Sequence, residues 1–265
     1  MMIYMIKQIY LMIGIGVILV VGIISFWFLP IFMESQQSFK TGPTGVQVLD
    51  RTSSAEDKKE NYKVDIKYPQ IIGMKDSKTE EVINDFLNDK ANKMQMDFIE
   101  SLKDTKPPQV GRPGELVEIE KIQSQFIVKY KVAQATEKII SVQFMIIDSQ
   151  PGMAHPYNYN DVFNYEVVKK KEIDLGDLFK ENSDYLDVLS EKAKKDLLNQ
   201  QKENPNAADF VNEGAAPDAK NYKLFTVAPK DLVIIFDPAT VAPDYFGTMK
   251  VAIPLSDLSD ILISN

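Results

Sequence analysis

Apolar positions divide the chain into an unbroken apolar run, a polar segment, and a region where apolar residues recur at regular spacing. The run covers residues 11–33, which are 23 residues without a charged side chain. A helix needs about 20 such residues to cross the roughly 30 Å hydrocarbon core of a bilayer. We therefore predict one transmembrane helix over 11–33, preceded by a short cytoplasmic segment, 1–10.

The residues that flank this run are typical of a signal anchor. Lys7 precedes it, Glu34 follows it, and Trp27 lies near its far end. Positive charge favours the cytoplasmic side, so we expect the N-terminus inside and the C-terminal domain outside the cell membrane. A cleaved signal peptide would have a shorter apolar region followed by small residues. A buried core helix would have a polar face. Both alternatives fit the residues less well.

Two further segments complete the first part of the chain. Residues 34–60 are polar and show no hydrophobic period, so we predict a flexible stalk. Strict alternation over 62–68 then predicts a half-buried strand. Ser77 and Glu80 have the spacing of a capping box, and the apolar residues behind them recur with a helical period. This pattern predicts a helix over about 78–103.

The remaining elements follow from the same patterns. A short strand near 116–122 and two long strands joined by a hairpin at 135–138 complete the first half. In the second half, Ser183 or Asp184 begins a helix that ends near residue 201. The other predicted elements are a strand at 162–168, a polar surface excursion at 204–219, strands at 222–227, 232–236 and 248–253, and a terminal helix at 255–262.

Strands in runs with helices between them indicate an α+β fold. We predict antiparallel sheets packed with two main helices, in two β/α halves, 61–155 and 156–265. Without the single positive side chain before residue 34, the 30 Lys and Arg residues become 29 against 38 acidic residues, a net charge of −9. Such a surface repels nucleic acid and favours cationic partners, although solubility alone also accounts for it. The absence of cysteine excludes disulfides, thiolate metal sites and a lipoprotein anchor.

Few residues suggest chemistry. The single histidine, His155, lies in a Pro-flanked turn, where a structural role is the simplest interpretation. One histidine without cysteine does not make a zinc site, and no nucleophile elbow or phosphate-binding loop occurs. We therefore predict no metal, no cofactor and no enzyme activity. The alternative is a hydrolase that uses Asp174, Asp237 or Asp244 with His155, because paired carboxylates can perform acid–base chemistry.

Loop aromatics are better candidates for a contact surface, because aromatic side chains often anchor interfaces. Two segments carry them, 151–160 and 237–247. The candidate ligand-binding residues are His155, Tyr157, Tyr159, Asp244, Tyr245 and Phe246.

Several motifs in these segments resemble one family. They are Gly-Met-Ala-His-Pro at 152–156, Glu-Ile-Asp-Leu-Gly-Asp-Leu-Phe at 172–179, Val-Ala-Pro-Asp-Tyr-Phe-Gly at 241–247, and Val-Ala-Ile-Pro at 251–254. The family is the bacterial extracytoplasmic domain of unknown function shared by the lysozyme-sensing anti-sigma factor RsiV and the non-catalytic N-terminal part of the peptidoglycan deacetylase PdaC. The resemblance covers roughly 60–264.

The resemblance implies a tethered α+β domain outside the cytoplasmic membrane. In the RsiV branch this domain binds lysozyme, a cationic protein. The residues here include neither a long cytoplasmic segment for holding a sigma factor nor the metal-binding motifs of a deacetylase, so we expect neither of these functions. We expect a membrane-tethered binding or sensing domain for a cell-wall component such as peptidoglycan, or for a cationic protein such as lysozyme. A structural envelope protein that pairs through a sheet edge is a further alternative.

Overall fold

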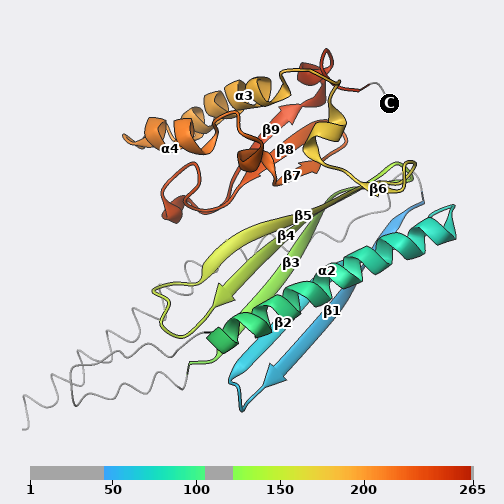
Figure 1. Ribbon diagram of the computed structural model, residues 1–265, viewed down its shortest axis with the longest axis vertical. Coiled ribbons are helices and arrows are strands. Elements are labelled where there is room, and N and C mark those ends of the chain that lie inside the picture. The colour runs from blue at the N-terminus through green and yellow to red at the C-terminus, as the bar shows by residue number, and fades with distance from the viewer. Residues whose placement is uncertain (1–44, 105–121, 264–265) are drawn as a thin grey trace, which may run out of the picture. The chain divides into compact units, whose positions relative to one another are not determined.

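The computed structural model describes residues 45–104 and 122–263 (Figure 1). These residues lie in one compact unit, Lys40–Asn265. The predicted transmembrane segment 11–33, the first part of the predicted stalk and nearly all of the short strand near 116–122 lie outside the described residues. Within the described ranges, no helix is both long and apolar enough to cross a membrane.

The first half is a six-stranded sheet whose strands lie side by side in chain order, β1 to β6 (Figure 1). The strands are β1 (Gln47–Asp57), β2 (Tyr62–Ile72), β3 (Ser124–Ala135), β4 (Ile139–Ser149), β5 (Tyr157–Glu166) and β6 (Lys171–Glu172). All neighbours pair antiparallel except β2 and β3, which are parallel. The α+β class is confirmed, but the prediction of purely antiparallel sheets is wrong for this pair. The chain between β2 and β3 contains a long helix, and such a crossover returns the next strand in the same direction.

Strand β1 corrects the predicted stalk for residues 47–57. It pairs with β2 over its whole length, from Gln47 opposite Ile72 to Asp57 opposite Tyr62. Most of its side chains are exposed, because β1 is an edge strand. An edge strand with few buried positions lacks apolar alternation, so the sequence pattern gave no signal there.

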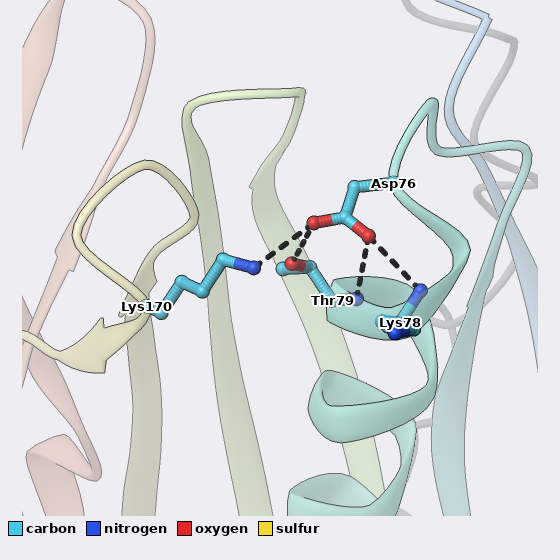
Figure 2. Close-up of polar contacts among 4 residues, drawn as sticks. All are labelled: Asp76, Lys78, Thr79 and Lys170. Atoms are coloured by element: carbon cyan, nitrogen blue, oxygen red, sulfur yellow. Dashed lines mark hydrogen bonds and ion pairs between the residues drawn. The ribbon is translucent and has the colours of Figure 1, made fainter.

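Helix α2 (Ser77–Asp104) confirms the predicted long helix, but its cap is Asp76 rather than Ser77. One oxygen of the Asp76 carboxylate accepts hydrogen bonds from two backbone N–H groups of the first turn, at 3.1 and 3.3 Å. The other oxygen accepts from the Thr79 hydroxyl (2.6 Å) and from the Lys170 ammonium group (3.0 Å), as Figure 2 shows. Glu80 accepts a hydrogen bond from a backbone N–H ahead of the helix (2.8 Å). Asp76 thus caps α2 and also ties its start to the turn between β5 and β6.

One face of the six-stranded sheet packs against α2 and forms the first hydrophobic core. On the hairpin, Phe126, Val128, Val132 and their counterparts on β4 are buried, and Tyr130 is partly buried against the same core. The helix contributes buried apolar residues at helical spacing. These are Ile83, Leu87, Ala91, Met94 and Phe98.

The second half contains a three-stranded antiparallel sheet with its own core. Its elements are α3 (Tyr185–Gln200), α4 (Ala207–Gly214), β7 (Phe225–Val227), β8 (Asp231–Phe236) and β9 (Met249–Pro254), with short 3-10 turns at Leu175–Leu178, Ala219–Tyr222, Asp244–Phe246 and Leu255–Leu258. Helix α3 and the three strands confirm the predicted elements. Four details differ from the prediction.

The first detail is that the polar excursion at 204–219 contains α4, which buries Val211. A Cβ added at Gly214 would lie 2.1 Å from the Thr240 carbonyl oxygen, so glycine allows this close approach. The second is that Leu198, an apolar residue of α3, is 40% exposed. The third is that the terminal helix is reduced to the single turn Leu255–Leu258. These residues follow tertiary packing rather than local periodicity.

The fourth detail concerns the boundary between the halves. The strand predicted at 162–168 begins earlier, at Tyr157, and pairs with β4 in the first sheet. The first core therefore includes Val167, and the second begins with Ile173. The predicted division at residue 155 falls in the turn between β4 and β5, and the six-stranded sheet continues beyond it to β6.

The second face of the six-stranded sheet contacts the second half through buried polar side chains. The Ser141 hydroxyl donates to Asn164 Oδ1 (2.6 Å) and accepts from the backbone N–H of Val227 (2.9 Å). Asn164 Nδ2 donates to the carbonyl oxygen of Phe225 (2.9 Å). Ser141 and Asn164 are only 0% and 4% exposed, so hydrogen bonds, not apolar contacts, fix β7 against this face at these positions.

Candidate functional site

The two segments that carry the candidate ligand-binding residues meet in the folded protein. His155 lies in the turn between β4 and β5, and Asp244 begins the 3-10 turn Asp244–Phe246. His155 Nε2 lies 3.5 Å from Asp244 Oδ2, and both side chains are more than half exposed. Residues about ninety positions apart in sequence thus share one surface. Whether this surface binds a ligand stays a prediction.

Each of the two segments carries one exposed aromatic ring that packs on a half-buried ring. Tyr157 is 55% exposed and stacks on Tyr159, with ring centroids 5.3 Å apart. Tyr245 is 63% exposed and packs on Phe246 at 4.8 Å. Tyr159 packs against the first core and Phe246 against the second. The two half-buried rings therefore hold the two exposed rings in place, which lowers the entropy lost when a partner binds.

The end of the second segment is closed by Gly247. Its φ of +67° lies in the left-handed region, which glycine enters without steric cost. Its N–H donates to the carbonyl oxygen of Asp244 (2.8 Å) and so completes the turn that presents Tyr245.

A chain of polar contacts lies beside the two segments and links them. Asp237 Oδ1 accepts from both the backbone N–H (2.8 Å) and the side-chain amide (2.7 Å) of Asn160. Asn160 Oδ1 accepts from Gln143 Nε2 (2.6 Å), and Gln143 Oε1 accepts from Lys250 Nζ (2.9 Å). Burial raises the pKa of Asp237, and the two bonds from Asn160 oppose that rise. This network joins β4 and β5 to the segment that follows β8.

A pocket of about 300 Å³ opens on the α2 side of the sheet, next to the same segment of β5. Its apolar walls are Met94, Phe98, Phe126 and Ile146, and its polar lining is Asp97, Ser101, Asp148, Tyr159, Asn160 and Asp161. Tyr159 thus belongs both to the stacked pair and to the pocket. Burial, together with nearby carboxylates, raises the pKa of Tyr159 to about 12.

The candidate catalytic carboxylates have different partners. Asp244 approaches His155, but Asp237 binds Asn160. Asp174 lies in a turn, where its backbone N–H donates to Asp177 Oδ2 (3.0 Å). Neither Asp174 nor Asp237 forms a hydrogen bond with His155 in the part of the chain that the structure describes. Over the same residues, no group of three or more histidine, cysteine or carboxylate side chains could hold a metal ion.

No pattern in the sequence indicated the pocket. Asp97, Asp148 and Asp161 lie on α2, β4 and β5, which are far apart along the chain. No spacing rule connects them.

Comparison with known proteins places two family regions in succession along the chain. Residues 55–158 match the family described as "Deacetylase PdaC", and residues 176–256 match "Protein of unknown function (DUF3298)". The predicted resemblance is confirmed. The first region covers most of the six-stranded sheet and α2, and the second covers α3, α4 and the whole three-stranded sheet. The aromatic segments lie at the end of the first region and near the end of the second.

Two proteins from Bacillus subtilis are similar to this chain. Peptidoglycan-N-acetylmuramic acid deacetylase PdaC is 33% identical over 137 residues, 51% of this chain and 28% of that protein. Anti-sigma-V factor RsiV is 24% identical over 213 residues, 78% of this chain and 68% of that protein. The chain thus spans only about a quarter of the PdaC protein that it matches.

Solved structures support the fold. A member of the DUF3298 family from Bacteroides fragilis superposes with a TM-score of 0.56 at 13% identity, over 86% of this chain and 96% of that chain. A DUF3298 family protein from Pseudomonas aeruginosa gives a TM-score of 0.50 at 15% identity, over 84% and 95%. Such low identity establishes a shared fold and nothing about ligands.

Proposed function

We propose that this chain is a membrane-tethered, extracytoplasmic binding or sensing domain whose ligand is a cationic protein such as lysozyme or a cell-wall component such as peptidoglycan. The observation that carries this proposal is the pair of exposed rings, Tyr157 and Tyr245, each of which packs on a half-buried ring. Pre-positioned exposed aromatics are typical energetic centres of protein interfaces. The His155–Asp244 pair lies between the two segments and brings them together.

The relatives support an extracytoplasmic role. RsiV is an anti-sigma factor and PdaC acts on peptidoglycan by name. The tether is the apolar run 11–33 in the sequence. The net charge of −8 on the whole chain favours association with a cationic partner over an anionic one.

Binding of the full chain in detergent to hen lysozyme and to insoluble peptidoglycan tests the proposal. We expect micromolar or tighter binding to one of the two. Tyr157→Ala and Tyr245→Ala should each weaken it about tenfold or more, as removal of an interface anchor does. Val168→Ala is the matched control, because Val168 is exposed (72%) and lies outside both segments. Binding to neither ligand, or equal weakening by Val168→Ala, would contradict the proposal.

We propose binding without catalysis. His155 and Asp244 are both exposed, whereas a general acid or base is usually tuned by burial or close charges. Incubation of the protein with peptidoglycan should release neither reducing sugar nor acetate. Turnover that His155→Ala abolishes would favour the hydrolase alternative instead.

A further inference from the structure

The 300 Å³ pocket beside β5 combines apolar walls with acidic groups. Phe98 and Phe126 stack on each other with ring centroids 4.8 Å apart and form part of the wall. Three carboxylates, Asp97, Asp148 and Asp161, complete the lining, and no lysine or arginine is among the lining residues. A pocket of this kind matches a long side chain with an apolar stem and a positive end.

The three carboxylates differ in their partners. Asp161 pairs with Lys90 (2.7 Å) and Asp97 with Lys93 (2.8 Å), so two of them already have a cation. Asp148 has none among the described residues. Its carboxylate accepts hydrogen bonds from the uncharged amide of Gln150, at 3.1 and 3.2 Å.

Asp148 is the carboxylate with which a bound cation would form an ion pair. Burial raises the pKa of Asp148, which means that its negative charge is incompletely stabilised in the free protein. Its neighbour Tyr159 also has a raised pKa, in part because of Asp148. A positive group placed beside Asp148 would offset both effects.

We infer that this pocket receives an arginine or lysine side chain of a cationic protein partner, with Asp148 as the ion-pairing group. The inference rests on the proposed binding function and names the chemistry of the partner. The aliphatic stem would lie along Met94 and Ile146, and the charged end would reach Asp148. An aromatic face at Phe98 or Tyr159 also favours a cation. Tyr159 lines the pocket and also stacks on Tyr157, which belongs to the proposed contact surface. The pocket and the contact surface are therefore adjacent.

A peptide pair tests the inference without a folded ligand. Hexa-arginine and hexa-citrulline have nearly the same shape but differ in charge. The full chain in detergent should bind hexa-arginine and not hexa-citrulline by calorimetry. Asp148→Asn should weaken hexa-arginine binding about tenfold, the loss of one charge-assisted pair, while Asp148→Glu retains most of it.

Two controls separate the pocket from the overall negative charge. Asp209→Asn removes the same charge at an exposed site on α4 and should leave the affinity within about twofold. In ¹³C-methyl spectra, hexa-arginine should shift the Met94 signal, which lies in the pocket, and leave that of Met249, which lies in the second core.

Three outcomes would overturn the inference. Equal binding of both peptides would show that charge is not recognised. Unchanged hexa-arginine binding in Asp148→Asn would place the contact elsewhere. Peptidoglycan binding that Asp148→Asn abolishes, without any binding of hexa-arginine, would assign the pocket to an envelope polymer. Failure of the proposed function gives a different result from failure of this inference. In that case neither lysozyme nor peptidoglycan binds, while hexa-arginine still binds through Asp148.

Discussion

The two faces of strand β4 are both buried, but they are held by different forces. Ile140, Val142 and Phe144 face α2 and are completely buried in the first core. Ser141 and Gln143, which alternate with them, are also buried, yet they face the second half through hydrogen bonds. No buried side-chain nitrogen or oxygen in the described part of the chain lacks a partner. One face is thus stabilised by the hydrophobic effect and the other by matched polar groups.

The difference shows how the two halves keep a defined arrangement. Apolar contacts are non-directional and tolerate small shifts. Buried hydrogen bonds require donors and acceptors at fixed positions. A shift of one half relative to the other would leave buried polar groups unpaired, which costs free energy. The polar face therefore orients the halves, and with them the two segments that carry Tyr157 and Tyr245.

The largest expected effect is on the apolar face. Phe144→Ala removes a ring with 0% exposure and should lower the free energy of unfolding by about 3–5 kcal/mol. Urea denaturation followed by circular dichroism measures it. A loss below about 1 kcal/mol would mean that the first core does not govern global stability.

A smaller effect is expected on the polar face. Asn164→Ala leaves the Ser141 hydroxyl and the Phe225 carbonyl oxygen without this partner, so it should cost about 1–3 kcal/mol. The double variant with Ser141→Ala should cost less than the sum of the two single variants, since both remove the same bond. Additive losses would show that the two side chains act independently and that the polar face is not a coupled network.

The cap of α2 should contribute less, and its contribution should depend on pH. Hydrogen bonds from Thr79 and Lys170 hold the pKa of Asp76 well below its usual value of 3.8. The stabilisation by this cap is therefore fully present above pH 4 and declines as the pH falls from there toward the lowered pKa. Asp76→Ala should lower Tm by about 2–4 °C at pH 7 and by less near pH 2. A pH-independent difference would argue against the carboxylate as the cap.

The smallest effect, with the opposite sign, is expected at the pocket. Burial raises the pKa of Asp148 above its usual value of 3.8, so ionisation in the folded state lowers stability as the pH rises through that range. Asp148→Asn should therefore raise Tm slightly at pH 7, by no more than about 2 °C, and have no effect near pH 3. A lower Tm at pH 7 would mean that Asp148 is a structural residue rather than one held ready for a ligand.

Local patterns were enough to predict several elements. The helical spacing of Ile83, Leu87 and Ala91 predicted α2, and the apolar alternation on β3 and β4 predicted two strands joined by a hairpin. These patterns are reliable because a helix or strand with one apolar face must bury that face. The motifs around His155 and Asp244 also indicated which two segments carry the candidate contact surface.

How distant segments meet could not be predicted from local patterns and is seen in the tertiary structure. The pairing of β1, the parallel alignment of β2 and β3, and the burial of Ser141 and Asn164 depend on neighbours contributed by other parts of the chain. A buried polar residue with a partner has the same sequence signature as an exposed one. The approach of His155 to Asp244 and the gathering of carboxylates around Asp148 follow from the same cause, because proximity in space is set by packing and hydrogen bonding between elements rather than by spacing along the chain.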